Sequence, residues 1–158
     1  MKGNPLIELR EATQDDILAL CGLLKTLFSG EREFIPNADV QKCALEMILG
    51  NPEIGKIFVC QNDGEIIGMV SLLFTISTAL GGKVAMLEDM IMSSQFQGKG
   101  FGTKLLAHAI AEAKKLTCKR LTLLSDTDNL NAHRFYEQFG FKYSPMLPMR
   151  LILEDAFR

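Results

Sequence analysis

The features that mark several protein classes are missing from this 158-residue sequence. Its four cysteines are spaced too widely for a tight disulfide framework or for paired metal ligands: Cys21, Cys43, Cys60 and Cys118. Basic and acidic residues are interspersed and the net charge is -2, so we expect no nucleic-acid partner. No apolar run is long enough to cross a bilayer as a helix, and the N-terminus lacks the apolar core of a secretion signal. We therefore expect a cytoplasmic protein with buried, reduced cysteines, no metal and no membrane partner.

Hydrophobic residues are plentiful, at 47% of the chain. A chain of this length can bury roughly two thirds of the surface that its unfolded form exposes. We predict one compact domain over residues 1–158.

The first quarter of the chain predicts a strand and two helices. Pro5 to Arg10 alternates apolar and polar residues, and Thr13 to Asp16 resembles a capping box that opens a helix ending near Phe28. A loop is predicted from Ser29 to Asn37. A second amphipathic helix follows, with a predicted apolar face of Val40, Cys43, Ala44, Met47 and Ile48.

The middle of the chain predicts three antiparallel strands. Lys56 to Gln61 and Glu65 to Thr78 form a hairpin, because Asp63-Gly64 supplies the positive φ angles of a tight turn. Gly81-Gly82 marks a second turn, and Lys83 to Met92 predicts the third strand.

The last third predicts a return to the sheet. Leu105 to Leu116 has helical spacing, and Arg120 to Ser125 predicts a strand, which together with the preceding strand makes a βαβ crossover. Asn131 to Gln138 predicts a shorter helix, and Phe141 to Tyr143 and Met149 to Leu153 predict final strands. The expected fold class is α/β, with one mixed, mostly antiparallel sheet, helices on both faces and a central βαβ crossover.

A glycine cluster lies between the third strand and the long helix. Gly98, Gly100 and Gly102 place unpaired N–H groups at the positive end of the helix dipole, an arrangement typical of an anion site. The alternative is that these glycines only permit a tight turn and close helix packing. The spacing matches neither the dinucleotide fingerprint nor the P-loop, which argues against NAD or ATP.

The glycine cluster also resembles a known family motif. Gln97-Gly98-Lys99-Gly100-Phe101-Gly102 is similar to the Q/R-x-x-G-x-G/A signature of the GNAT N-acetyltransferase superfamily. The segment from Asn131 to Phe141 resembles that family's N-x-x-A-x-x-F-Y-x-x-x-G-F segment, except that Ala132 directly follows Asn131. The predicted order of elements is also that of the family, so the resemblance covers essentially the whole chain.

The resemblance implies a GNAT-like fold and acetyl-CoA as the cosubstrate. It implies that the glycine loop binds the pyrophosphate, while main-chain groups of the preceding strand serve the thioester carbonyl and the pantetheine arm. The cofactor-binding residues expected on this basis are Ile91, Met92, Gln97, Gly98, Lys99, Gly100, Phe101, Gly102, Thr103 and Asn131.

Two residues are candidates for proton transfer. Glu88 lies just before the glycine loop, where a carboxylate could take the amine proton; the alternative is a solvated strand carboxylate. Asp89 would point to the opposite face unless a bulge intervenes. The resemblance implies that Tyr136 protonates the leaving thiolate, and the alternative for Tyr136 is a core aromatic.

The sequence thus favours an acetyl-CoA-dependent N-acetyltransferase that acts on a primary amine by direct attack in a ternary complex. A non-catalytic module that senses acyl-CoA is the alternative. A cationic acceptor, either a small molecule or a peptide amine, is favoured by four acidic residues: Glu31, Glu33, Glu88 and Asp89. A homodimer is compatible with the sequence.

Overall fold

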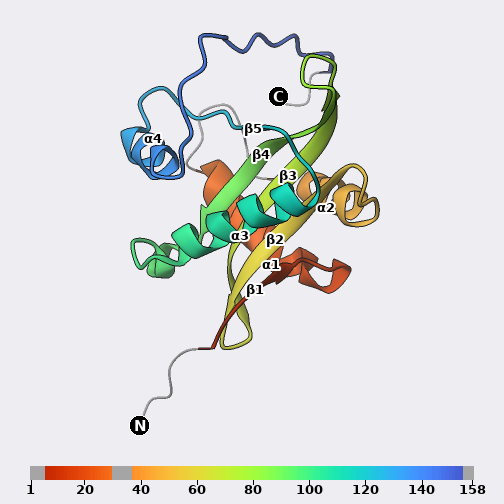
Figure 1. The fold of residues 1–158 in the computed structure, drawn as a ribbon. Helices are drawn as coiled ribbons and strands as arrows, with labels where there is room; N and C mark the ends of the chain where they lie inside the picture. The colour runs from red at the N-terminus through yellow and green to blue at the C-terminus, as the bar shows by residue number, and fades with distance from the viewer. Residues whose placement is uncertain (1–5, 30–36, 155–158) are drawn as a thin grey trace. The chain divides into compact units, whose positions relative to one another are not determined.

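The fold in Figure 1 is that of a computed structural model, which describes residues 6–29 and 37–154. The chain divides into two compact units, Met1–Leu123 and Leu124–Arg158, and each is described by itself. The elements of the first unit are β1 (Ile7–Glu11), η1 (Gln14–Asp16), α1 (Ile17–Ser29), α2 (Ala38–Leu49), β2 (Gly55–Asn62), β3 (Glu65–Ser77), β4 (Gly82–Met92), η2 (Ser94–Phe96), α3 (Phe101–Lys115) and β5 (Leu121–Thr122). The second unit contains α4 (Leu130–Glu137).

The first unit is built on a five-stranded sheet in the order β1-β2-β3-β4-β5. The first four strands pair antiparallel, and β5 pairs parallel to β4 after the crossover through α3. In the β2–β3 turn, Asp63 and Gly64 have φ angles of 48° and 87°. The predicted α/β fold class, hairpin and βαβ crossover are therefore confirmed.

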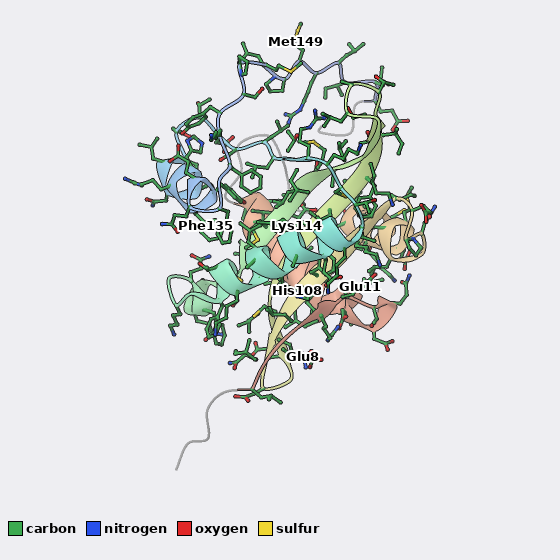
Figure 2. All side chains as sticks on the ribbon, in the orientation of Figure 1. Glu8, Glu11, His108, Lys114, Phe135 and Met149 are labelled. Carbon is green, nitrogen blue, oxygen red and sulfur yellow. The ribbon has the colours of Figure 1, made fainter. Side chains whose placement is uncertain are left out.

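Helices cover both faces of this sheet. Alternate residues of β2 point to opposite faces, so Ile57 packs with α1 whereas Phe58 contacts His108 of α3 edge-on at 5.4 Å between ring centroids. Figure 1 shows α3 crossing one face of the sheet, and Figure 2 labels His108 on it. No helix in the described part of the chain has the length and apolar character needed to cross a membrane.

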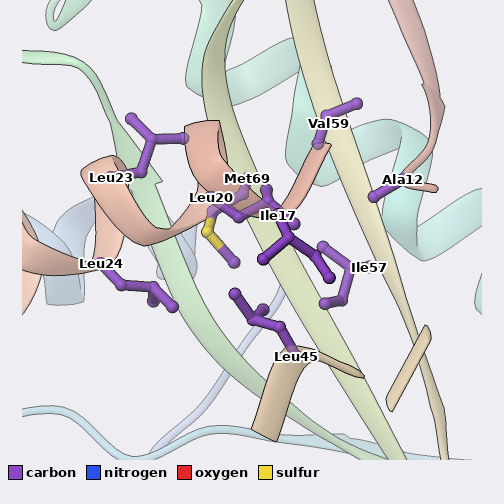
Figure 3. Close-up of a cluster of buried hydrophobic side chains, with 9 residues drawn as sticks. All are labelled: Ala12, Ile17, Leu20, Leu23, Leu24, Leu45, Ile57, Val59 and Met69. Atoms are coloured by element: carbon purple, nitrogen blue, oxygen red, sulfur yellow. The ribbon is translucent and has the colours of Figure 1, made fainter. Parts of the chain in front are cut away.

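The hydrophobic core between α1, α2 and the sheet is continuous (Figure 3). Full burial of each large aliphatic side chain contributes about 1.5–3 kcal/mol relative to exposure, so this cluster supplies much of the force that holds α1 on the sheet. Its members are Ala12, Ile17, Leu20, Leu23, Leu24, Leu45, Ile57, Val59 and Met69.

The helix α2 is confirmed, but its predicted apolar face is largely wrong, since Ile48 is the one residue of the five that packs against the core cluster. Its buried residues are Gln41 and Leu45, whereas Val40 and Met47 are 64% and 62% exposed. Cys43 is exposed too, and Cys21 and Cys118 are partly exposed, so the expectation of four buried cysteines is confirmed for Cys60 alone. The buried face of α2 is the one that packs against α1 and the sheet. The face predicted from hydrophobic spacing lies about one residue before the buried positions 41 and 45.

The two final strands predicted from Phe141 to Tyr143 and from Met149 to Leu153 do not form in the structure. Pro145 and Pro148 interrupt the segment, and proline cannot donate a ladder hydrogen bond. The Met149 side chain is 96% exposed and projects away from the chain (Figure 2), so the apolar alternation here does not mark burial. The strand predicted from Arg120 to Ser125 is also shorter, with only Leu121–Thr122 in the ladder.

The second unit is organised around α4. Asn129 caps the helix by accepting a hydrogen bond from the N–H of Ala132 at 3.2 Å, and Gly140 follows it with φ 92°. His133 on α4 links the segment before the helix to the segment after it. One of its ring nitrogens lies 2.8 Å from the Asp126 carbonyl oxygen and the other lies 3.0 Å from the Tyr143 hydroxyl. The predicted short helix is confirmed.

A charged pair anchors the start of α1 to the sheet. Arg10 on β1 donates two hydrogen bonds to Asp16, at 2.8 and 3.0 Å, and also bonds to Gln61 on β2. Asp16 also accepts the N–H of Thr13 at 2.7 Å, which confirms the predicted capping box. Only 8% of Asp16 is exposed, and the hydrogen bonds from Arg10 hold the pKa of its carboxyl below the usual range.

We expect Asp16→Asn to lower the free energy of unfolding at pH 7 by about 3 kcal/mol, because it leaves the Arg10 guanidinium without its charged partner and with only neutral acceptors such as Gln61. Since the folded-state pKa of Asp16 is lowered, its contribution is present above the unfolded pKa, near 4, and is lost as the pH falls further. Urea unfolding at pH 7 and pH 3 should show the difference from wild type shrinking at the lower pH. The exposed neighbour provides the control, since Asp15→Asn should change stability by less than about 0.5 kcal/mol.

Candidate active site

A β-bulge interrupts β4 just before its end. Ser71 of β3 pairs with Glu88, and Met69 pairs with Ile91, so two residues of β4 oppose one residue of β3 between these pairs. Asp89 lies in the bulge with φ 51°, in the left-handed region that few non-glycine residues adopt. Because of the extra residue, Glu88 and Ile91 lie on the same face of the sheet as Met69 and α1.

The bulge is followed by a strand edge that β5 does not cover. β5 pairs with β4 only at Ala85 and Met86. Within the described residues of the first unit, β4 continues to Met92 with no further ladder partner on that side. Such an edge presents main-chain N–H and C=O groups to an extended ligand. Ile91 and Met92, two of the expected cofactor-binding residues, lie on it.

Gln97 ties the loop after β4 back to the strand. Its side-chain Nε2 donates a hydrogen bond of 3.0 Å to the main-chain carbonyl of Met92. The N–H of Ser93 donates to Ile67 on β3 at 2.7 Å, which fixes the strand end. The glycine loop therefore leaves the sheet at a defined position.

The glycine loop presents a run of main-chain donors. In the part of the chain that the structure describes, the N–H groups of residues 98 to 103 donate no hydrogen bond, whereas those of Gln97 and Lys104 on either side do. Gly98 and Gly100 have φ angles of 71° and 85°, and a Cβ at either would meet nothing within 4 Å. These two glycines are thus required by the backbone conformation, not by close helix packing. With exposed Lys99 and Lys104 beside it, the N-terminus of α3 can bind an anion.

Two predicted site residues belong to the second unit. Asn131 lies in the first turn of α4, and its side-chain oxygen accepts a hydrogen bond from Arg134 at 3.0 Å. Tyr136 is half-buried between the rings of Phe135 and Phe141, and burial raises the pKa of its hydroxyl to about 12. The Tyr136 hydroxyl is therefore protonated throughout the neutral pH range.

Most of the predicted site comes together along one continuous segment, from Glu88 through the glycine loop to Thr103. Glu88 itself is exposed. Ser71, which is paired with Glu88, was not predicted from the sequence; the available signal was a serine inside an otherwise apolar run. Among the described residues, no group of His, Cys, Asp or Glu could hold a metal ion.

Comparison with known proteins identifies the family. A sequence model of the acetyltransferase (GNAT) family matches residues 18–141. The chain belongs to the GNAT acetyltransferase family. An aminoalkylphosphonate N-acetyltransferase of Salmonella typhimurium is 26% identical over 140 residues, which cover 89% of this chain and 88% of that protein. A Bacillus subtilis spermine/spermidine N(1)-acetyltransferase is 36% identical over 59 residues, covering 37% of this chain and 39% of that protein.

The solved structures show the same GNAT fold. The aminoglycoside N-acetyltransferase AAC(6')-Iy, in complex with CoA, superposes with a TM-score of 0.81 at 17% identity, covering 97% of this chain and 99% of that one. The family match and the named relatives together show that the protein is an N-acetyltransferase.

We expect Gly100→Ala to weaken CoA binding at least tenfold, because the left-handed φ disfavours alanine and a reshaped loop turns its N–H groups away from the pyrophosphate. Gly64→Ala is a matched control, since Gly64 has nearly the same φ and equally open surroundings but lies in the β2–β3 turn. Both variants should lose about 1 kcal/mol of stability, and only Gly100→Ala should lose affinity in calorimetric titration with CoA. Equal affinities in the two variants would contradict a role for this loop in binding.

Proposed function

We propose that this N-acetyltransferase transfers the acetyl group of acetyl-CoA directly to a primary amine within a ternary complex. The run of N–H groups that donate no hydrogen bond at residues 98 to 103, directly after the bulged strand that carries Glu88, is the observation that supports this most. Six consecutive main-chain donors at a helix N-terminus suit a diphosphate, and the free edge of β4 suits the extended pantetheine arm. Structural neighbours solved with CoA agree with this cosubstrate.

Glu88 is proposed to receive the proton that the amine loses. A lysine-like amine is mostly protonated at pH 7, and its deprotonation costs roughly 4 to 5 kcal/mol. Because Glu88 is exposed, its carboxylate can take this proton directly or through a water and pass it to solvent. The neutral nitrogen then attacks the thioester carbon, and an N–H of β4 near Ile91 or Met92 stabilises the negative charge on the carbonyl oxygen.

Tyr136 is proposed to act on the leaving thiolate as the C–S bond breaks. With its pKa at about 12, the hydroxyl always carries its proton at neutral pH. Complete transfer to a thiolate of ordinary pKa would cost roughly 5 kcal/mol, so a hydrogen bond to the developing charge is the stronger contribution. The attacking nitrogen loses its second proton to solvent as the amide forms, and solvent in turn supplies the proton that ends on the thiol. No covalent cysteine intermediate is needed.

The acceptor is proposed to be a cationic amine. Glu88 carries its charge on an exposed surface, and Asp89 follows it in the bulge. Glu31 and Glu33, which also motivated this prediction, lie outside the described residues. The named relatives acetylate an aminoalkylphosphonate and spermine or spermidine, all of which contain a primary amine. The cytoplasmic location, the single domain and the homodimer stay predictions.

We expect Glu88→Gln and Tyr136→Phe each to lower kcat by well over tenfold, because one removes the proton acceptor and the other removes the hydrogen bond to the thiolate. Release of free CoA with a saturating amine measures the rate, and initial velocities at varied concentrations of both substrates should give intersecting lines. Matched controls are Glu53→Gln, at an exposed carboxylate outside the site, and Tyr143→Phe, at the other tyrosine of the second unit. Unchanged rates in the first pair would remove the proposed roles.

Among amines of similar size, polyamines and lysine-like diamines should have kcat/KM values at least tenfold above those of uncharged aromatic amines, since Glu88 and Asp89 are proposed to lie beside the acceptor. Mass spectrometry of the products after incubation with acetyl-CoA checks the panel. A preference for neutral acceptors would refute the cationic assignment alone. Tight CoA binding without acetylation of any amine would instead favour a sensing module.

A further inference from the structure

Ser71 carries a hydroxyl that has no partner in the interior of the protein. The residue is 0% exposed, and its Oγ makes no hydrogen bond within the part of the chain that the structure describes. Two of the neighbouring strand residues are apolar: Ile57 pairs with Ser71 from β2, and Met69 lies on the same face of β3. A buried hydroxyl without a partner costs about 1–3 kcal/mol. Alanine would fit here without that cost, so the serine has another use.

The sheet register places one polar group beside this hydroxyl. Ser71 is the direct cross-strand partner of Glu88 on β4, and directly opposite residues have Cβ atoms about 4.5–5.5 Å apart on the same face. Of the two cross-strand partners of Ser71, only Glu88 has a polar side chain. A glutamate is long enough for rotation of its side chain to carry the carboxylate from solvent to the Ser71 hydroxyl.

We propose that Ser71 is a positioning residue, whose hydroxyl donates a hydrogen bond to the Glu88 carboxylate when that carboxylate turns inward to meet the acceptor amine. This inference rests on the proposed role of Glu88 as the base. The hydrogen bond fixes the orientation of the carboxylate and favours its ionised form. Ser71 touches neither the acetyl group nor the amine and acts only through Glu88.

Other charged groups near Glu88 bear on its titration. Its own strand contributes Asp89 and, near the far end, Lys83; β3 contributes Glu65 at its far end, and β5 has no ionisable side chain. The helix on the same face, α1, contributes Cys21 and Lys25. The helix on the opposite face, α3, carries Lys104, His108, Glu112, Lys114 and Lys115. None of these residues is the register partner of Glu88, a place that Ser71 occupies.

The test compares Ser71→Ala with Ser71→Thr, which keeps a hydroxyl, and with Thr75→Ala, which removes an exposed hydroxyl from the same strand. Without its donor, Glu88 should ionise at higher pH, so the acid limb of the kcat/KM profile of Ser71→Ala should move up by about half to one pH unit. Its kcat should fall about fivefold with little change in KM for the amine. Thermal stability should be unchanged or higher, because an unpaired buried hydroxyl has been removed.

Ser71→Thr should restore the wild-type acid limb, and Thr75→Ala should not move it. Ser71→Cys, which nearly keeps the volume but donates weakly, should behave like Ser71→Ala and covers the case in which alanine fails to fold. An acid limb that stays in place in both Ser71→Ala and Ser71→Cys overturns the inference. The proposed function of Glu88 fails separately, if Glu88→Gln keeps the wild-type kcat. If Glu88→Gln lowers kcat but the acid limb of the Ser71 variants stays in place, only the role of Ser71 is refuted.

Discussion

The bulge in β4 is the constraint on which the rest of the site depends. One extra residue opposite β3 places Asp89 in a left-handed conformation and restarts the alternation of the strand. As a result Glu88, which precedes the bulge, and Ile91, which follows it, lie on the same face. A regular strand would send these two residues to opposite faces, because they are an odd number of positions apart. The irregularity thus brings a carboxylate and the free edge of the same strand to one place, and the buried sheet around it supports the local strain.

The segment after the bulge contributes the main-chain donors that are proposed to bind the pyrophosphate. Gln97 holds the loop to the Met92 carbonyl, and positive φ angles at Gly98 and Gly100 turn the chain so that α3 begins with its N–H groups unpaired. The proposed base, the strand edge and these donors follow one another along a single stretch of chain. Their geometry depends on how firmly β4 and α3 are held, which the packing of helices on both faces of the sheet provides.

A buried polar group without a partner marks a position where this fold gives up stability. Ser71 keeps such a hydroxyl beside Ile57 and Met69. Arg10 and Asp16 are different, since each satisfies the other and together they fix the start of α1. Unsatisfied polar groups in a core call for a functional explanation, whereas satisfied pairs usually have a structural one.

The sequence by itself determined the features that depend on neighbouring residues. These include the Asp63-Gly64 hairpin, the capping box at Thr13, the helices and the glycine loop, because turn chemistry and helical periodicity are local properties. Only the tertiary structure decided where β4 gains its extra residue, that Ser71 faces Glu88 and that α2 buries Gln41. Each of these depends on which backbone or helix lies opposite, and strand pairing and helix packing join residues far apart in the sequence. Hydrophobic periodicity predicts whether a segment is a helix or a strand, but it does not predict which element that segment packs against.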